Sequence, residues 1–165
     1  MPDSTTVFVS KERFKFSSAH MTVFPDGTKE ALHGHNFQVS LSTQVPDTAF
    51  SRMIDFSVFK KVLQRLCAQC DERVIIATQN PFFEGCEVEG QYEMTLCGKR
   101  YVFPRDEVAL LDVDNITTEA LSKLLLHQFL DALRVMGLLD RVDQVELRVD
   151  ETRGQGAAST YRREK

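Results

Sequence analysis

The sequence has no long hydrophobic run and no large basic block, and we expect no leader segment. No stretch of about 18 uncharged apolar residues occurs, which argues against a membrane span. The net charge is −4, and basic residues group only in the terminal Arg-Arg-Glu-Lys at 162–165, which argues against a nucleic-acid binder. The first four residues, Met-Pro-Asp-Ser, offer neither the charged start nor the apolar stretch of a signal peptide. We therefore expect a cytoplasmic protein that binds neither membranes nor nucleic acids.

Cysteine is also scarce, and no cysteine precedes Cys67. Cys67 and Cys70 are spaced to share one face of a predicted helix, and a Cys-x-x-Cys pair can begin a zinc site. Cys86 and Cys97 do not form the second such pair that a four-cysteine site needs. We expect small core thiols in a reducing compartment.

The chain contains no linker, repeat or low-complexity tract, so we expect residues 1–165 to form one domain. Alternating apolar residues predict strands, and apolar residues at helical spacing predict helices. The expected elements are strands at 5–19 and 34–45, a helix at 56–70 with Asp55 as N-cap, an extended piece at 71–78, a hairpin at 87–103, a helix from Thr117 or Thr118 to Gly137, and a final strand at 142–149. This order predicts an α+β fold in which two helices cover one face of an antiparallel sheet.

Histidine is rare too, and its distribution is uneven. Three of the four histidines, His20, His33 and His35, lie within sixteen residues. Residues 33–42 alternate like a strand, in which i and i+2 point to the same side, so His33 and His35 project together while Gly34 faces away. On a helix the two rings would be about 200° apart and unable to share a metal. His127 lies in an apolar helical stretch, where we expect it to pack or to face solvent.

His20 ends a second alternating stretch, Phe-Lys-Phe-Ser-Ser-Ala-His at 14–20. The connection to His33 contains Pro-Asp-Gly at 25–27, which is typical of a turn. If the two strands pair antiparallel, the three imidazoles converge at the mouth of one hairpin. Zinc held by three histidines keeps an open fourth position, as catalytic sites do. The alternative is a polar strand surface without a metal.

Two of these segments, Phe-Ser-Ser-Ala-His at 16–20 and Leu-His-Gly-His-Asn-Phe at 32–37, resemble the zinc motifs of the 6-pyruvoyl- and 6-carboxytetrahydropterin synthases. Further segments resemble this family in order along the chain: Met-Ile-Asp-Phe at 53–56, Asn-Ile-Thr-Thr-Glu at 115–119 and Val-Asp-Glu-Thr at 149–152. The resemblance implies the T-fold and a homo-oligomer, with trimers that pair as hexamers around a β-barrel. It also implies sites between subunits.

The resemblance implies a chemistry as well. The family's substrate is 7,8-dihydroneopterin triphosphate, and a zinc ion acts as a Lewis acid on its side-chain oxygens. The implied zinc ligands are His20, His33 and His35. Glu151 would hold the pterin ring, because a carboxylate can accept two hydrogen bonds from adjacent N–H groups. Thr117, Thr118 and Glu119 would make further pterin contacts, although the same residues at a helix start are also good capping residues.

The catalytic relay of the tetrahydropterin-forming members is missing. In those members a cysteine four residues before the first histidine of His-Gly-His acts as the base, and here this position is Lys29. A histidine that follows an aspartate completes their relay, whereas the corresponding pair here is Asp71 and Glu72. A synthase of that kind would need Asp71, Glu72 or a water in place of the lost groups.

Glu30 offers a different base. The segment Glu-Ala-Leu-His-Gly-His at 30–35 resembles a variant branch of the family, Glu-x-x-His-Gly-His, which cuts the substrate to 6-hydroxymethyl-7,8-dihydropterin for folate synthesis. A carboxylate near zinc with little water around it is expected to have a raised pKa and to serve as general base. The alternative is that Lys29 and Glu30 form an ordinary polar pair in a loop.

Three functions follow, in order of preference. The first is a zinc-dependent lyase that cleaves 7,8-dihydroneopterin triphosphate with Glu30 as base. The second is a 6-carboxy- or 6-pyruvoyl-tetrahydropterin synthase, of the queuosine or biopterin kind, with a replaced relay. The third is a zinc-containing pterin-binding module without activity. The missing cysteine and histidine argue against the second function, and the retained histidines and Glu151 argue against a wholly decayed site.

Overall fold

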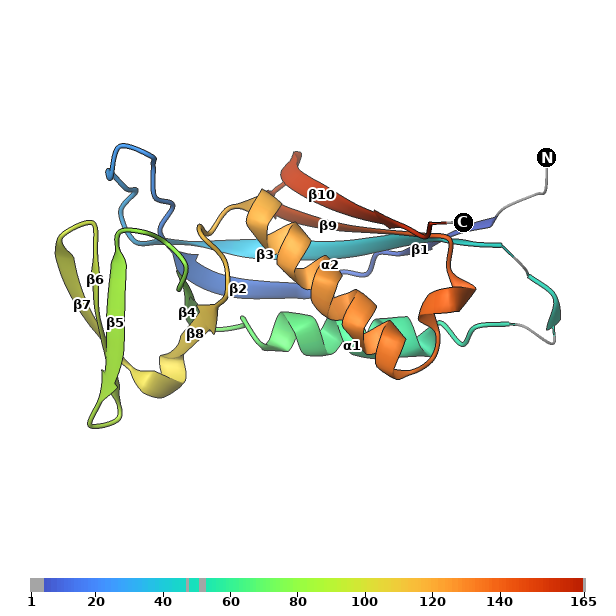
Figure 1. Ribbon diagram of the computed structural model, residues 1–165, viewed down its shortest axis with the longest axis horizontal. Helices are drawn as coiled ribbons and strands as arrows, with labels where there is room; N and C mark the ends of the chain where they lie inside the picture. The colour runs from blue at the N-terminus through green and yellow to red at the C-terminus, as the bar shows by residue number, and fades with distance from the viewer. Residues whose placement is uncertain (1–4, 47, 51–52, 165) are drawn as a thin grey trace.

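Two sheets and two α-helices, with short 3-10 helices at Arg105–Glu107 and Leu139–Arg141, make up the described part of the chain (Figure 1). The computed structural model describes residues 5–46, 48–50 and 53–164, so residues 1–4, on which the signal-peptide expectation depends, lie outside it. The main sheet has the strand order β10-β9-β3-β2-β4-β8, and β1 also pairs with β3. Its strands are β1 (Thr5–Val9), β2 (Lys15–His20), β3 (His33–Val45), β4 (Arg73–Ala77), β8 (Val108–Leu111), β9 (Gln144–Thr152) and β10 (Gln155–Arg162).

Both helices lie on one face of the main sheet. Helix α1 (Ser57–Ala68) and helix α2 (Thr118–Val135) contact each other through Phe59 and Phe129, whose ring centroids are 5.6 Å apart. Alternate residues of the strands, such as Val39 on β3 and Leu147 on β9, bury their side chains beneath the helices. The predicted α+β class, with two helices on one face of a largely antiparallel sheet, is confirmed. Assembly into a barrel stays a prediction.

A second sheet lies at one end of the molecule (Figure 1). It consists of β5 (Phe83–Val88), β6 (Gln91–Leu96) and β7 (Lys99–Pro104), paired antiparallel. The predicted hairpin is present, because Cys97 and Gly98 join β6 to β7 with φ of 50° and 74°. A two-residue turn with positive φ at both positions matches the right-handed twist of the strands. The prediction missed most of β5.

Several predicted boundaries are wrong. The expected first strand is two strands, because a turn in which the Phe14 N–H donates to the Lys11 carbonyl separates β1 from β2. Strands β4 and β8 join the sheet in parallel, next to β2 and to each other. Asp55 is not the N-cap of α1. The N-cap is Phe56, and the Asp55 carboxylate accepts hydrogen bonds from the backbone and hydroxyl of Ser57 at 2.8 and 2.6 Å.

The expected final strand is followed by another, β10, which pairs antiparallel with β9. Strand β10 is mostly polar and exposed, so it lacks the apolar alternation that marks a strand in a sequence. Gly156 at its start is packed so closely that a Cβ there would lie 2.4 Å from the Val149 carbonyl oxygen. This close approach requires glycine and accompanies a register shift between Gln155 and Gly156. Within the described ranges, no helix is long and apolar enough to cross a membrane.

The contact between the two helices should dominate stability. Phe129 is fully buried, so we expect Phe129→Ala to lower the free energy of unfolding by about 3 to 5 kcal/mol, through lost burial and the cavity left behind. Phe8→Ala is the matched control, because Phe8 is 76% exposed and the same change should cost less than about 1 kcal/mol. Urea denaturation measures both variants, and similar losses would contradict this account of the core.

Candidate metal centre

Strands β2 and β3 bring the three predicted zinc ligands together. In the antiparallel register His20 lies opposite His33, and His35 lies opposite Ser18. The centroid of the His20 ring lies 4.6 Å from that of His33 and 5.3 Å from that of His35. The centroids of the His33 and His35 rings are 4.9 Å apart. One ring nitrogen from each histidine lies within 4.8 Å of the others. The predicted convergence at the mouth of one hairpin is therefore present.

The chemical state of the rings suits a metal ion. His20 is 2% exposed, and neither of its ring nitrogens has a hydrogen-bond partner. A buried polar atom without a partner is costly unless a ligand satisfies it. Burial, together with the neighbouring His33 and His35, lowers the pKa of His20 from 6.5 to about 4. His20 is therefore neutral at pH 7, as a metal ligand must be.

The hydrogen bonding of His33 also favours metal binding. Its Nδ1 lies 2.9 Å from the Ala31 carbonyl oxygen, an acceptor, so Nδ1 carries the proton and donates it. The Nε2 lone pair is then left free for a metal, and the hydrogen bond holds the ring in place. Three imidazole nitrogens form a donor set that zinc accepts.

Gly34 allows β2 and β3 to approach closely between the two histidines of β3. A Cβ at this position would lie 3.3 Å from the Ser18 carbonyl oxygen, which is tighter than ordinary contact. The sequence predicted only that Gly34 faces away from the histidines. The structure adds a reason for glycine at this place, because a side chain would press on the backbone of the partner strand.

Glu30 lies beside the cluster. Its Oε2 is 3.9 Å from His33 Nε2, and its side chain is 41% exposed. The pKa of Glu30 is lowered, chiefly because the Thr22 hydroxyl hydrogen-bonds the carboxylate, while partial burial opposes the shift and His33 adds to it. The expected rise in this pKa is therefore wrong for the metal-free protein. The carboxylate is ionised at neutral pH and is free to accept a proton.

The segment just before α2 is hydrogen-bonded to the loop between β2 and β3. The Thr22 Oγ1 lies 3.2 Å from the Ile116 carbonyl oxygen, which competes with the Glu30 carboxylate for the single hydroxyl proton. The Asn115 side-chain amide exchanges hydrogen bonds of 3.0 and 2.8 Å with the backbone of Val23. These contacts bring the N-terminus of α2 next to the end of β2. Sequence reasoning assigned no role to Thr22 or Asn115, because a sequence does not show which groups will lie beside these side chains in the fold.

The predicted pterin contacts at this helix start have visible capping roles. Thr117 is the N-cap of α2, and its hydroxyl accepts from the Ala120 N–H at 3.2 Å. The Thr118 hydroxyl is buried and lies 3.4 Å from a carboxylate oxygen of Glu119. Hydrogen bonds from the backbone and from Thr117 lower the pKa of Glu119. Capping alone accounts for these positions, so pterin contact stays a prediction.

Glu151 lies near the end of β9, one residue beyond Asp150, which pairs with Gln38 of β3. It is the extra residue at the register shift opposite Gln155 and Gly156. Glu151 is half-buried, and one of its carboxylate oxygens accepts from the Gln155 side chain at 2.6 Å. Its carboxylate retains further acceptor capacity for a ligand.

Asp71 and Glu72 lie beside Ser17 of β2, and Glu72 lines a pocket of about 440 Å³ together with Gly34 and His35. The Asp71 carboxylate accepts from the Ser17 N–H at 2.8 Å, and the Glu72 N–H donates to the Ser17 carbonyl at 2.7 Å. Both residues are exposed, between α1 and β4. Ser17 alternates with Ser18 and His20, so its side chain lies on the opposite face of β2.

The cysteines divide into two kinds. Cys67 and Cys70 are buried free thiols, as predicted, and burial raises the pKa of Cys67 to about 12 and that of Cys70 to about 11. The same expectation is wrong for Cys86, which is exposed on β5, while Cys97 is half-buried. Neither of these two lies on the strands that carry the histidines.

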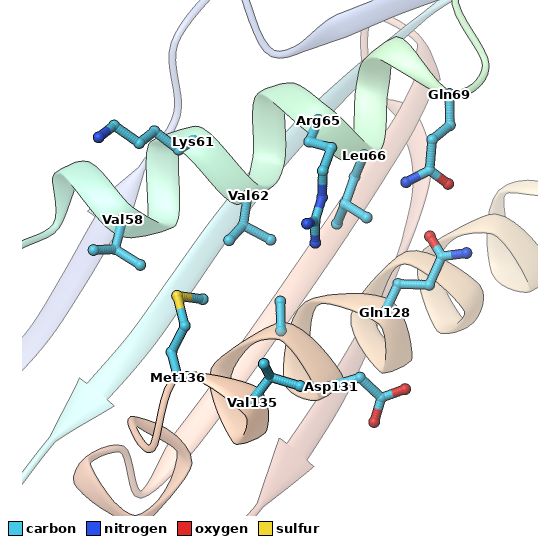
Figure 2. Close-up of a pocket in the computed structure, with 11 residues that line it drawn as sticks. Val58, Lys61, Val62, Arg65, Leu66, Gln69, Gln128, Asp131, Val135 and Met136 are labelled. Carbon is cyan, nitrogen blue, oxygen red and sulfur yellow. The ribbon is translucent and has the colours of Figure 1, made fainter.

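A groove of about 790 Å³ lies elsewhere, between α1 and α2. Figure 2 shows Val62 and Leu66 facing Val135 and Met136 across it, with charged and amide side chains along its edges. None of the predicted site residues lines this groove. His127 is also exposed on α2, apart from the other three histidines.

The fold and the histidine cluster define a T-fold protein with a candidate metal centre. A sequence profile described as 6-pyruvoyl tetrahydropterin synthase matches residues 9–164, and the chain belongs to this family of pterin-processing enzymes. A protein of Methanocaldococcus jannaschii, provisionally assigned as 6-carboxy-5,6,7,8-tetrahydropterin synthase, is 27% identical over 146 residues, 87% of each chain.

Two solved structures of 6-pyruvoyl tetrahydropterin synthases share the whole architecture. That of Plasmodium vivax is 26% identical with a TM-score of 0.88, over 97% of this chain and 99% of that one. That of Plasmodium falciparum is also 26% identical with a TM-score of 0.88, over 96% and 98% of the two chains. Further structures of the P. vivax enzyme carry alanine or cysteine in place of a glutamate described as a catalytic residue.

The neutral His20 predicts an acid-sensitive apoprotein. Its pKa falls from 6.5 to about 4 on folding, so the unfolded chain binds the proton more readily between these values. Stability is therefore lost as pH falls from about 6.5 to about 4, by on the order of 3 kcal/mol at ~1.4 kcal/mol per pKa unit. Urea denaturation of the metal-free protein at pH 7 and pH 4 measures this loss. His20→Gln should flatten the pH dependence, and an equal decline in both proteins would contradict the assignment.

Proposed function

We propose that the protein is a zinc-dependent lyase that cleaves 7,8-dihydroneopterin triphosphate to 6-hydroxymethyl-7,8-dihydropterin, with Glu30 as general base. The observation that carries this proposal is the position of the Glu30 carboxylate, 3.9 Å from Nε2 of His33 in the three-histidine cluster. A base at this place would face a substrate oxygen bound at the centre of the cluster.

Zinc is the proposed metal, and His20, His33 and His35 are its proposed ligands. The two buried, unpartnered ring nitrogens of His20 support this assignment, as does the free Nε2 of His33. Zinc bound there would supply Lewis-acid polarisation of the substrate's side-chain oxygens. Because the pKa of His20 is low, a proton would not compete with the metal for its ring nitrogen at neutral pH.

Glu30 would accept the proton of the hydroxyl on the second side-chain carbon. A carbonyl forms at that carbon, the bond to the first carbon breaks, and its electron pair passes into the pterin ring system. The first carbon then takes up a proton. The products are 6-hydroxymethyl-7,8-dihydropterin and a two-carbon aldehyde that retains the triphosphate, and no oxidant or reductant is needed.

Two observations favour a carboxylate base over a thiolate. No cysteine precedes Cys67, and the thiols of Cys67 and Cys70 are buried with raised pKa values, so they are protonated at neutral pH. A glutamate is described as a catalytic residue in the P. vivax enzyme, which is 26% identical to this chain. We propose that Glu30 has the same role here.

The remaining site residues are proposed as substrate contacts. Glu151 would accept hydrogen bonds from the amine and adjacent ring N–H of the pterin, with Thr117, Thr118 and Glu119 as further contacts. Asp71 and Glu72 contact Ser17 of their own subunit, whose side chain lies on the face of β2 opposite to His20, so we propose that they would act at a site across a subunit boundary. This agrees with the trimer or hexamer that the family resemblance implies.

A 6-carboxy-tetrahydropterin synthase is the second candidate, favoured by the provisional assignment of the M. jannaschii relative. Mass spectrometry of the products from zinc-loaded protein and 7,8-dihydroneopterin triphosphate separates the candidates. A 6-hydroxymethyl product supports the proposal, and a carboxy or pyruvoyl product overturns it in favour of a synthase. Bound but unchanged substrate would indicate a binding module.

The base is tested by Glu30→Gln. This change keeps the size of the side chain and removes its ability to take up a proton, so we expect full zinc content and a fall in kcat of at least about 100-fold. Elemental analysis and product formation measure the two properties. Glu12→Gln is the matched control, because Glu12 is exposed before β2 and should tolerate the change. Full turnover in Glu30→Gln would leave the family assignment standing and the proposed base wrong.

The metal centre is tested by His33→Ala. Removing one of three ligands should abolish zinc retention after dialysis, because the remaining imidazoles cannot complete the coordination. His127→Ala removes a histidine that is exposed on α2, so it should retain the zinc content of the parent. Equal zinc in the His33→Ala variant and the parent protein would exclude His33 as a ligand.

A further inference from the structure

We propose that Lys29 is a positioning residue that holds Glu30 beside the histidine cluster by anchoring its loop to Tyr101 of the second sheet. This inference rests on the proposed function, in which Glu30 is the base. It assigns a role to the position at which the tetrahydropterin-forming relatives were inferred to carry their catalytic cysteine, and to a sheet that has no part in the metal centre itself.

The loop that carries Glu30 is an ordered turn. Its two arms form a β-bridge between Val23 and Lys29, and the Glu30 N–H donates to the Thr22 carbonyl at 2.9 Å. At the tip, the Phe24 N–H donates to the Thr28 carbonyl at 2.8 Å. These bonds fix the path of the loop, but they leave the peptide that follows Glu30 to be held by something else.

The ammonium of Lys29 supplies that hold. Its Nζ donates to the Glu30 carbonyl at 2.9 Å and lies 3.3 Å from the sulfur of Met21. It also lies 5.2 Å from the centroid of the Tyr101 ring on β7, within the range of a cation–π interaction. A lysine in a turn usually extends into water. Lys29 instead is half-buried, with a partner on β7, one at the end of β2 and one on Glu30 itself.

Lys29 acts on the placement of Glu30 and not on its acidity. The ammonium binds the backbone carbonyl of Glu30, which fixes the peptide plane and hence the direction in which the side chain leaves the backbone. The groups that shift the pKa of the Glu30 carboxylate are Thr22, His33 and His20, together with partial burial. Loss of Lys29 should therefore leave the base chemically competent and misplaced.

The second sheet is a rigid anchor for this contact. Tyr101 stacks on Phe103 with ring centroids 6.1 Å apart. Both pack against a separate buried cluster that includes Met21, the residue that follows His20, and Met94 of β6. The anchor of Lys29 and the end of the strand that carries His20 thus belong to one packed unit. A shift of about 1 Å in a catalytic group can cost up to about 100-fold in rate.

The test is steady-state kinetics of Lys29→Met and Lys29→Arg in the zinc-loaded protein. Methionine keeps the length and packing of the side chain but cannot donate or carry charge, so kcat should fall by about 10-fold or more, with unchanged KM and zinc content. Arginine keeps the donor and the cation–π contact and should restore most of kcat. Tyr101→Leu should lower kcat in the same direction but less. Lys123→Met on the exposed face of α2 is the control and should match the parent.

A double-mutant cycle gives the decisive readout. If Lys29 works through Glu30, adding Lys29→Met to Glu30→Gln should cause no further loss of kcat, because the group that it positions is already inactive. Independent, additive losses would overturn the proposal, as would loss of zinc or of folded protein in Lys29→Met. An inactive Glu30→Gln with a fully active Lys29→Met would overturn only the positioning role. A fully active Glu30→Gln would overturn the proposed function itself.

Discussion

The register that sets His20 opposite His33 is the constraint on which the candidate site depends. A slip of one residue between β2 and β3 would turn the histidines of one strand to the opposite face of the sheet. Buried aromatic side chains oppose such a slip, because Phe16 stacks on Phe37 with ring centroids 4.9 Å apart, directly beyond the histidines. Gly34 leaves room for the two backbones to come together. The helices that stabilise the sheet cover this same face, so packing and ligand geometry depend on one alignment.

Two different parts of the molecule contact the loop at the end of β2 and β3. On one side, Asn115 and Ile116, just before α2, bind the arm of the loop that follows β2. The second sheet holds the other arm of the same loop through Tyr101. The two sheets meet in a small buried cluster around Met21 and Val23, distinct from the main core under the helices. The loop between the two strands, which carries the candidate base Glu30, is thereby fixed at both arms.

The sequence predicted the parts of the structure that rest on local periodicity. Alternation along β2 and β3 was enough to bring His20, His33 and His35 together, and helical spacing located both helices. It failed where the partner of a residue is distant or is backbone. Strand β10 is mostly polar and exposed, so it has no apolar signal. The lowered pKa of Glu30 depends on a hydroxyl eight residues away, at Thr22, which only the folded loop brings near.

The three histidines come from one short hairpin, whereas Thr117 and Glu151 belong to α2 and β9. Closing a short loop costs little conformational entropy, and proteins open locally in units of unequal stability. A partly opened chain that kept the β2–β3 hairpin would keep His20, His33 and His35 together even if α2 had moved away from them. A metal ion bound by these three histidines would therefore be a poor indicator of native structure, because it could be retained after the walls that would enclose a substrate have been lost.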